Sequence, residues 1–175
     1  KTAGNHKAIR EFVRQHNIAH FYDVGEGICH QVMTEKGFAR PGTLILGSDS
    51  HTCSYGALNA FSAGIDRTEA AALMLTGETW LKVPQTIKIT LHGALMPPVS
   101  AKDLILSIIG DLGAAGATYC AVEFHGDVNF LTIADRLTIA NMGVEMGAKL
   151  AVFPVDDLTK KHLKSLGLNP KENKG

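Results

Sequence analysis

The sequence predicts a packed α/β fold divided near residue 82, and three observations support this prediction. Short apolar runs of strand length alternate with amphipathic or alanine-rich segments of helix length, as in proteins whose helices cover parallel sheets. Hydrophobic residues make up 45% of the 175-residue chain, which suffices for a packed core. Pro84 marks a boundary, because proline disfavours both helix and central strand. We therefore expect a first lobe over 1–82, a second lobe over 83–156, and a terminal helix with a polar linker over 157–175.

The elements of the first lobe follow from local patterns. Residues 5–16 carry Ile9, Phe12 and Val13 on one face, which predicts an amphipathic helix that Asn5 caps. Short apolar runs and alanine-rich stretches indicate the other elements of this lobe. These are strands over 19–24 and 43–46 and helices over 27–35, 57–63 and 67–76.

The second lobe is predicted in the same way. Ile87, Ile89 and Leu91 alternate with polar residues, which indicates a half-buried strand over 86–91. Residues 101–112 carry apolar side chains at helical spacing and predict a helix. The remaining predictions are strands over 119–124 and 150–153 and helices over 131–146 and 158–166.

Charge and composition argue against several classes of partner. Lys and Arg together number 17, as do Asp and Glu, and without a basic stripe we expect no nucleic-acid partner. Apolar runs are interrupted by glycine or polar residues, so no membrane span or signal peptide is predicted.

The three cysteines are odd in number and far apart, which favours a reducing, cytoplasmic location. A start without Met and a polar tail over 169–175 suggest a piece of a larger protein.

The segment Gly47-Ser48-Asp49-Ser50-His51-Thr52 is the strongest candidate for chemistry. It follows the predicted strand over 43–46, and open α/β sheets bind ligands at the carboxyl ends of their strands. Asp49 and Ser50 also suit the cap of a following helix, because both side chains accept backbone N–H bonds. An acid, a hydroxyl and an imidazole in succession therefore have a catalytic and a structural interpretation.

Three further residues are candidates. His30 lies in the first turn of a predicted helix, and Asn141 and Glu145 are four residues apart, on one face of another. Polar side chains buried on such a face need partners. Each also has a structural interpretation: His30 bonded to a backbone carbonyl, Glu145 in solvent, and Asn141 capping a kink near Gly143.

Several segments, in order along the chain, resemble the 3-isopropylmalate dehydratase large subunits of the aconitase superfamily. Homoaconitase large subunits share the same segments and are the second candidate. The matching segments are 27–31, 47–52, 83–84, 101–106, 116–119, 123–126 and 138–149. The resemblance implies two three-layer α/β lobes of the aconitase iron–sulfur domain type.

The resemblance also implies an activity. It is that of a hydro-lyase that moves a hydroxyl between adjacent carbons of a 2-hydroxy acid, such as isopropylmalate in leucine biosynthesis. The homoaconitase alternative implies lysine or coenzyme biosynthesis. By the same resemblance, the complete protein would hold a [4Fe–4S] cluster with one open iron, which would act as a Lewis acid on the substrate.

Residue roles follow from the same resemblance. The implied catalytic residues form two pairs, His30 with Asp49 and His51 with Glu145. Ser50 would bind a substrate carboxylate, and Asn141 would lie in the outer shell of the cluster.

The chain also departs from the family pattern. The family ligates its cluster through a Cys-Thr-Asn segment and a Cys-x-x-Cys pair, and neither motif occurs here. We therefore do not assign Cys29, Cys53 or Cys120 as ligands, and expect no metal in this piece. The swivel domain, a separate small subunit in isopropylmalate dehydratases, is the expected partner. We expect the chain alone to be inactive.

Two other function classes remain open. His30, Asp49, His51 and Glu145 are residue types of a mononuclear zinc or iron site, which would make a metal-dependent hydrolase, although their spacing matches no ligand motif. The third class is a non-catalytic domain used only for assembly with a partner.

Overall fold

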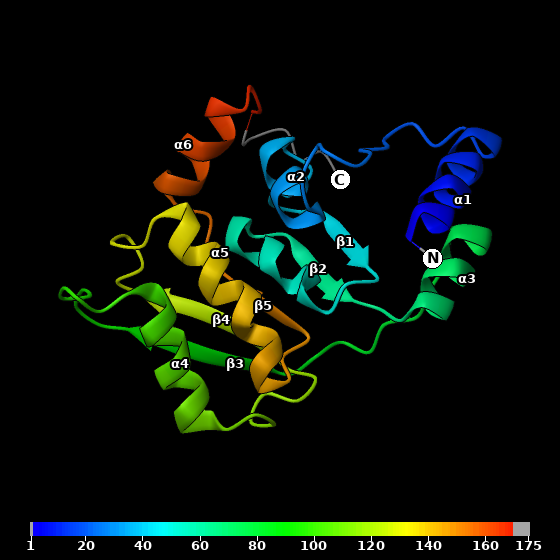
Figure 1. Cartoon of the computed structure of the whole chain (residues 1–175). Helices are drawn as coiled ribbons and strands as arrows, with labels where there is room; N and C mark the ends of the chain where they lie inside the picture. The colour runs from blue at the N-terminus through cyan, green and yellow to red at the C-terminus, as the bar shows by residue number, and fades with distance from the viewer. Residues whose placement is uncertain (1, 170–175) are drawn as a thin grey trace.

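The computed structural model describes residues 2–169, which form two parallel sheets linked by helices (Figure 1). In the first sheet, β1 (Leu44–Gly47) pairs with β2 (Phe61–Gly64). The second sheet has the order β3-β4-β5, with β3 over Thr86–Leu91, β4 over Ala121–Gly126 and β5 over Leu150–Val152. The predicted α/β class is confirmed. Of the predicted polar tail, residues 170–175 lie outside the described residues.

Helical segments connect the strands. They are α1 (Thr2–Gln15), α2 (Cys29–Glu35), η1 (Ser50–Leu58), α3 (Arg67–Thr76), α4 (Ala101–Leu112), α5 (Ile133–Asn141), η2 (Met142–Met146) and α6 (Asp157–Ser165), where η marks a 3₁₀ helix. Two of the α-helices begin at capping boxes, Ser100 with Asp103 before α4 and Thr132 with Asp135 before α5. These caps satisfy the first free amides and explain why the helices begin where they do.

The strand predicted over 19–24 is wrong. This stretch has no regular secondary structure, and its apolar run has no partner strand. Instead, Asp23 binds the guanidinium of Arg10 in α1, with Oδ2 2.6 Å from Nε and Oδ1 3.0 Å from Nη2. Two hydrogen bonds hold the chain beside α1 and take the place of strand pairing.

The helix predicted over 57–63 is also wrong. The 3₁₀ helix η1 ends at Leu58, and Asn59 reverses the chain in the left-handed region, with φ of 62°. The following residues enter β2, where Phe61 pairs with Leu44 of β1. Alanine-rich composition favours a helix, but pairing with the parallel strand β1 overrides that preference.

The larger hydrophobic core lies between the second sheet and helices α4 and α5. Phe124 of β4 stacks on Phe153 at a centroid distance of 4.7 Å, and Ala57 of η1 belongs to the same core. The 3₁₀ helix η1 also packs against β2, so it contacts elements of both sheets. Each sheet lies within one predicted lobe, and the division at residue 82 stays a prediction.

Two helices bury none of their residues, α1 and α3. Figure 1 shows α1 at the end of the long irregular segment that precedes α2. Within residues 2–169, no helix has both the length and the apolar character needed to cross a membrane.

Candidate functional site

Asp49 lies just beyond the carboxyl end of β1 and begins the site. Its backbone is extended, with φ of −96° and ψ of 136°, and its carboxylate Oδ1 accepts the backbone N–H of His51 at 2.7 Å. Its carbonyl accepts the hydroxyl of Thr52, also at 2.7 Å. Asp49 is therefore the N-cap of η1, as the structural interpretation expects, and this cap fixes the direction of its carboxylate.

His30 reaches the same carboxylate from α2. Its Nε2 lies 3.2 Å from Asp49 Oδ1, and its side chain is 22% exposed. Its other ring nitrogen, Nδ1, is buried and has no hydrogen-bond partner among residues 2–169. The observed partner of His30 is thus a carboxylate and not the backbone carbonyl of the structural interpretation.

His51 lies between two carboxylates. Its Nδ1 is 3.5 Å from Asp49 Oδ1 and 3.2 Å from the Ser50 hydroxyl oxygen, and its Nε2 is 3.7 Å from Glu145 Oε1. The rings of His30 and His51 are edge to face, with centroids 6.4 Å apart. Imidazoles and carboxylates therefore alternate in one series: His30, Asp49, His51 and Glu145.

Asn141 and Glu145 reach η1 from the second sheet's helices. The chain changes from α-helix to 3₁₀ helix at Met142, so Asn141 ends α5 while Glu145 lies in η2. Asn141 Nδ2 donates to the Ser54 hydroxyl at 2.9 Å, and that hydroxyl donates to the His51 carbonyl at 2.6 Å. The structure thus brings all of the predicted site residues around the beginning of η1.

Electrostatics keep the Asp49 carboxylate ionised. The backbone N–H of His51 is the main cause that lowers the pKa of Asp49 below its ordinary value. Burial opposes this effect, and the nearby His30 and His51 lower the pKa further. Burial raises the pKa of the Cys53 thiol to about 11, so this thiol stays protonated at neutral pH.

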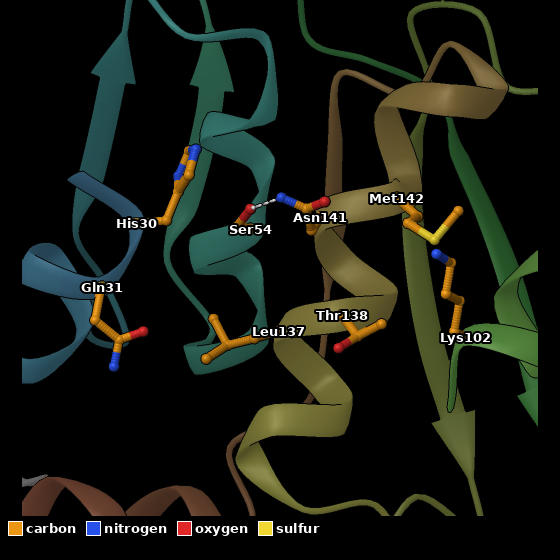
Figure 2. Close-up of a pocket in the computed structure, with 8 residues that line it drawn as sticks. All are labelled: His30, Gln31, Ser54, Lys102, Leu137, Thr138, Asn141 and Met142. Carbon is orange, nitrogen blue, oxygen red and sulfur yellow. Dashed lines mark hydrogen bonds between the residues drawn. The ribbon is translucent and has the colours of Figure 1, made fainter. Parts of the chain in front are cut away.

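A cavity of about 440 Å³ adjoins these residues (Figure 2). Its lining residues are His30, Gln31, Ser54, Lys102, Leu137, Thr138, Asn141 and Met142. Figure 2 shows the side chains of Ser54 and Asn141 joined by a hydrogen bond, with His30 beyond Ser54 on the side away from Asn141. An ammonium group, hydroxyls and amides beside an acid–base series suit a small anionic molecule.

Sequence reasoning missed Ser54 and Lys102. Ser54 follows His51 by three residues, which is one turn of a 3₁₀ helix, so that spacing was the available signal. Lys102 comes from α4, and nothing local to its sequence links it to His30.

Among residues 2–169, no group of three or more His, Cys, Asp or Glu side chains is arranged to hold a metal ion. The cysteines differ in environment: Cys29 is exposed, Cys53 is buried with Sγ 3.2 Å from the Ala140 carbonyl, and Cys120 is partly buried. The described residues therefore do not fit a cluster or a mononuclear metal on their own.

The sequence matches the model of a known protein family. The model of the aconitase family (aconitate hydratase) matches residues 2–174. This chain belongs to the aconitase family. The resemblance drawn from the sequence motifs is thereby confirmed.

Several curated relatives of this aconitase-family chain are about half identical to it in sequence. It is 49% identical over 165 residues to 3-isopropylmalate dehydratase large subunit 1 of Methanopyrus kandleri, covering 94% of this chain and 40% of the relative. It is 50% identical over 167 residues to a probable methanogen homoaconitase large subunit of Methanosarcina mazei, covering 95% and 43%. A 3-isopropylmalate dehydratase large subunit of Syntrophus aciditrophicus is 50% identical over 171 residues, covering 97% and 41%. The chain spans about two fifths of the length of these relatives.

Proposed function

We propose that this chain forms the acid–base wall of a hydro-lyase large subunit, acting on a 2-hydroxy acid such as isopropylmalate. The observation that carries the proposal is the series His30, Asp49, His51 and Glu145, whose nitrogen–oxygen distances are 3.2, 3.5 and 3.7 Å. The relatives' names and their near-50% identity support the same activity. The reaction removes a hydroxyl and a proton from adjacent carbons as water and returns them to exchanged positions.

The imidazoles would manage the hydroxyl's proton. A carboxylate that is hydrogen-bonded to one ring nitrogen of an imidazole fixes the tautomer and the orientation of that ring. Asp49 would do this for His30, whose Nε2 lies 3.2 Å from its carboxylate. Glu145, 3.7 Å from His51 Nε2, would act on His51 as a nearby negative charge. A proton given by such a pair lets the departing hydroxyl leave as water, and the pair recovers that proton when water adds back. The Ser50 hydroxyl, beside His51, would bind a substrate carboxylate.

The family resemblance implies a [4Fe–4S] cluster in the complete protein, where it would supply Lewis-acid chemistry. Residues 2–169 offer no ligand group for it, so its cysteine ligands would come from other segments. Asn141, at the end of α5 and beside the cavity, is the residue proposed to lie in its outer shell.

The proposed partner is a small swivel-domain subunit, since the relatives are named as large subunits. Such a subunit would complete the substrate site, and this chain alone would be inactive. The cytoplasm is the proposed location, because unpaired cysteines persist in reducing compartments.

Homoaconitase is the second candidate, because the Methanosarcina mazei relative is as similar as the dehydratases. The test is a chimera in which residues 2–169 replace the matching segment of the Syntrophus aciditrophicus large subunit, produced with that organism's small subunit. We expect turnover of isopropylmalate, and His51→Asn should reduce it by about 100-fold or more. Turnover of homocitrate alone would favour homoaconitase. A folded chimera without either activity would overturn the hydro-lyase proposal.

A further inference from the structure

Lys149 makes a long-range contact that the proposed chemistry does not use. Its Nζ donates to the backbone carbonyl of Gly64 at 2.8 Å, across 85 residues of sequence. The same ammonium lies 5.7 Å from the centre of the Tyr119 ring, within cation–π range. The side chain therefore joins the end of β2 to the segment between η2 and β5.

Gly64, which accepts this hydrogen bond, packs against the backbone of Asp49 and Ser50 at the beginning of η1. A Cβ added at Gly64 would lie 3.0 Å from the Asp49 carbonyl oxygen and 3.3 Å from Ser50 Cα. The next residue, Ile65, donates its N–H to the Gly47 carbonyl at 2.9 Å. The end of β2 therefore packs directly against the backbone that carries Asp49, and any movement of Gly64 displaces that backbone.

The Lys149 end is fixed to the segment that carries Glu145. Lys149 donates its backbone N–H to Cys120 at 2.8 Å, and Ala148 donates to Gly143 of η2 at 3.1 Å. Tyr119, which lies under the ammonium, donates its backbone N–H to Gly147 at 3.0 Å. The position of Lys149 thus follows that of η2, where Glu145 is four residues away.

We infer that Lys149 is a positioning residue, which sets the placement of the Asp49 turn relative to Glu145 and so aligns the two His–carboxylate pairs. The inference rests on the proposed function for its catalytic meaning. Its physical basis is a partly buried ammonium with one carbonyl acceptor and one aromatic face, because a charged donor in such a setting makes a stronger bond than a neutral one.

The test compares Lys149→Met with Lys149→Arg in the 175-residue chain. Methionine keeps the apolar stem and loses the charge, whereas arginine keeps both. Lys88→Met, on the exposed side of β3, is the matched control. Two NMR measurements report on the site: the pH titration of the Asp49 carboxyl carbon, and hydrogen exchange of the His51 amide that Asp49 accepts.

In Lys149→Met, we expect the pKa of Asp49 to rise toward its ordinary value and His51 amide exchange to accelerate about tenfold. Exchange of the Val122 and Phe124 amides in β4 should be unchanged. In Lys149→Arg, the Asp49 titration and the His51 amide exchange should both match those of the unaltered chain. An unchanged Asp49 titration, or equally accelerated exchange in β4, would overturn the inference. If the methionine variant did not fold, Lys149→Gln would serve. Failure of both to fold would assign Lys149 to overall stability.

These measurements need no turnover. An inactive chimera with a local response at Asp49 would therefore refute the hydro-lyase proposal and leave the positioning role of Lys149 in place.

Discussion

The Asp49 carboxylate lies 3.2 Å from Nε2 of His30, and the oxygen that makes this contact also caps η1. One oxygen thus holds an imidazole and begins a helix. Asparagine keeps most of the capping ability of aspartate but lacks its charge. The two roles of Asp49 are therefore separable by a single substitution.

We expect Asp49→Asn to change the free energy of unfolding by less than about 1 kcal/mol, because asparagine caps nearly as well as aspartate. In the chimera, the same change should reduce turnover by about 100-fold or more, because the charge facing His30 is lost. Urea denaturation and a dehydratase assay measure the two effects. Asp66→Asn, which alters the cap of α3, is the matched control. Equal activity losses in both variants would contradict a role specific to Asp49.

The buried ion pair between Arg136 and Asp156 should dominate the chain's response to mutation outside the site. Arg136 is fully buried, and its Nη1 lies 3.0 Å from Asp156 Oδ1. Asp156→Ala would leave that guanidinium without its counter-charge, at a cost of about 3–5 kcal/mol in the free energy of unfolding. Asp157→Ala is the control, since that neighbouring side chain is exposed and forms a surface ion pair with Lys160. A difference below about 1 kcal/mol between the two variants would refute this prediction.

The same pair predicts a loss of stability in acid. Burial raises the pKa of Asp156, but hydrogen bonds from Arg136 and the Thr159 amide, with the charge of Arg136, hold it below 3.8 overall. A depressed pKa means that the folded chain binds fewer protons, so the stabilisation is present above 3.8 and is lost as pH falls through the folded-state value. Urea midpoints from pH 6 down to about pH 2 should fall less steeply in Asp156→Asn than in the unaltered chain.

Cysteine labelling should separate Cys29 from Cys53. Cys29 is exposed, whereas Cys53 is 1% exposed and burial raises its pKa to about 11. Because the thiolate is the reactive form, iodoacetamide at pH 8 should modify Cys29 first and leave Cys53 unmodified until the chain unfolds. Peptide mass spectrometry reads the order, and labelling in urea is the control. Early modification of Cys53 in the folded chain would contradict the observed burial.

The hydrogen bond between Asn141 and Ser54 should couple α5 to η1. A double-mutant cycle with Asn141→Ala and Ser54→Ala measures this coupling through urea denaturation. We expect about 0.5–1.5 kcal/mol, the usual net value of such a bond. Additive effects of the two substitutions would mean that the bond contributes nothing.

Local sequence patterns predicted the elements with strong local signals. The strand over 86–91 and the helix over 101–112 match β3 and α4, because alternation and a capping box specify them within the segment itself. The segments over 19–24 and 57–63 were predicted wrongly, because their conformations depend on Arg10 and on β1. Patterns of this kind cannot report a partner that is distant in sequence.

The candidate site, like the fold, was predicted from the sequence only in part. The motif resemblance selected His30, Asp49, His51 and Glu145, and the structure brings them into one series. Lys149 escaped prediction because its role arises from a contact across 85 residues. The spacing of Ser54 from His51 was a local signal, but its other partner, Asn141, lies 87 residues away. Only the fold brings these partners together.

The exposure of α1 predicts where limited proteolysis begins. A 14-residue helix that buries nothing gains little from tertiary packing, and isolated helices of this length are marginal in water. Its ends open far more often than the core strands do, so a protease should cut first between α1 and α2. The surviving piece would begin near Cys29 and would still carry His30, Asp49, His51 and Glu145. We therefore expect the acid–base series to stay in the protected piece after α1 has been removed.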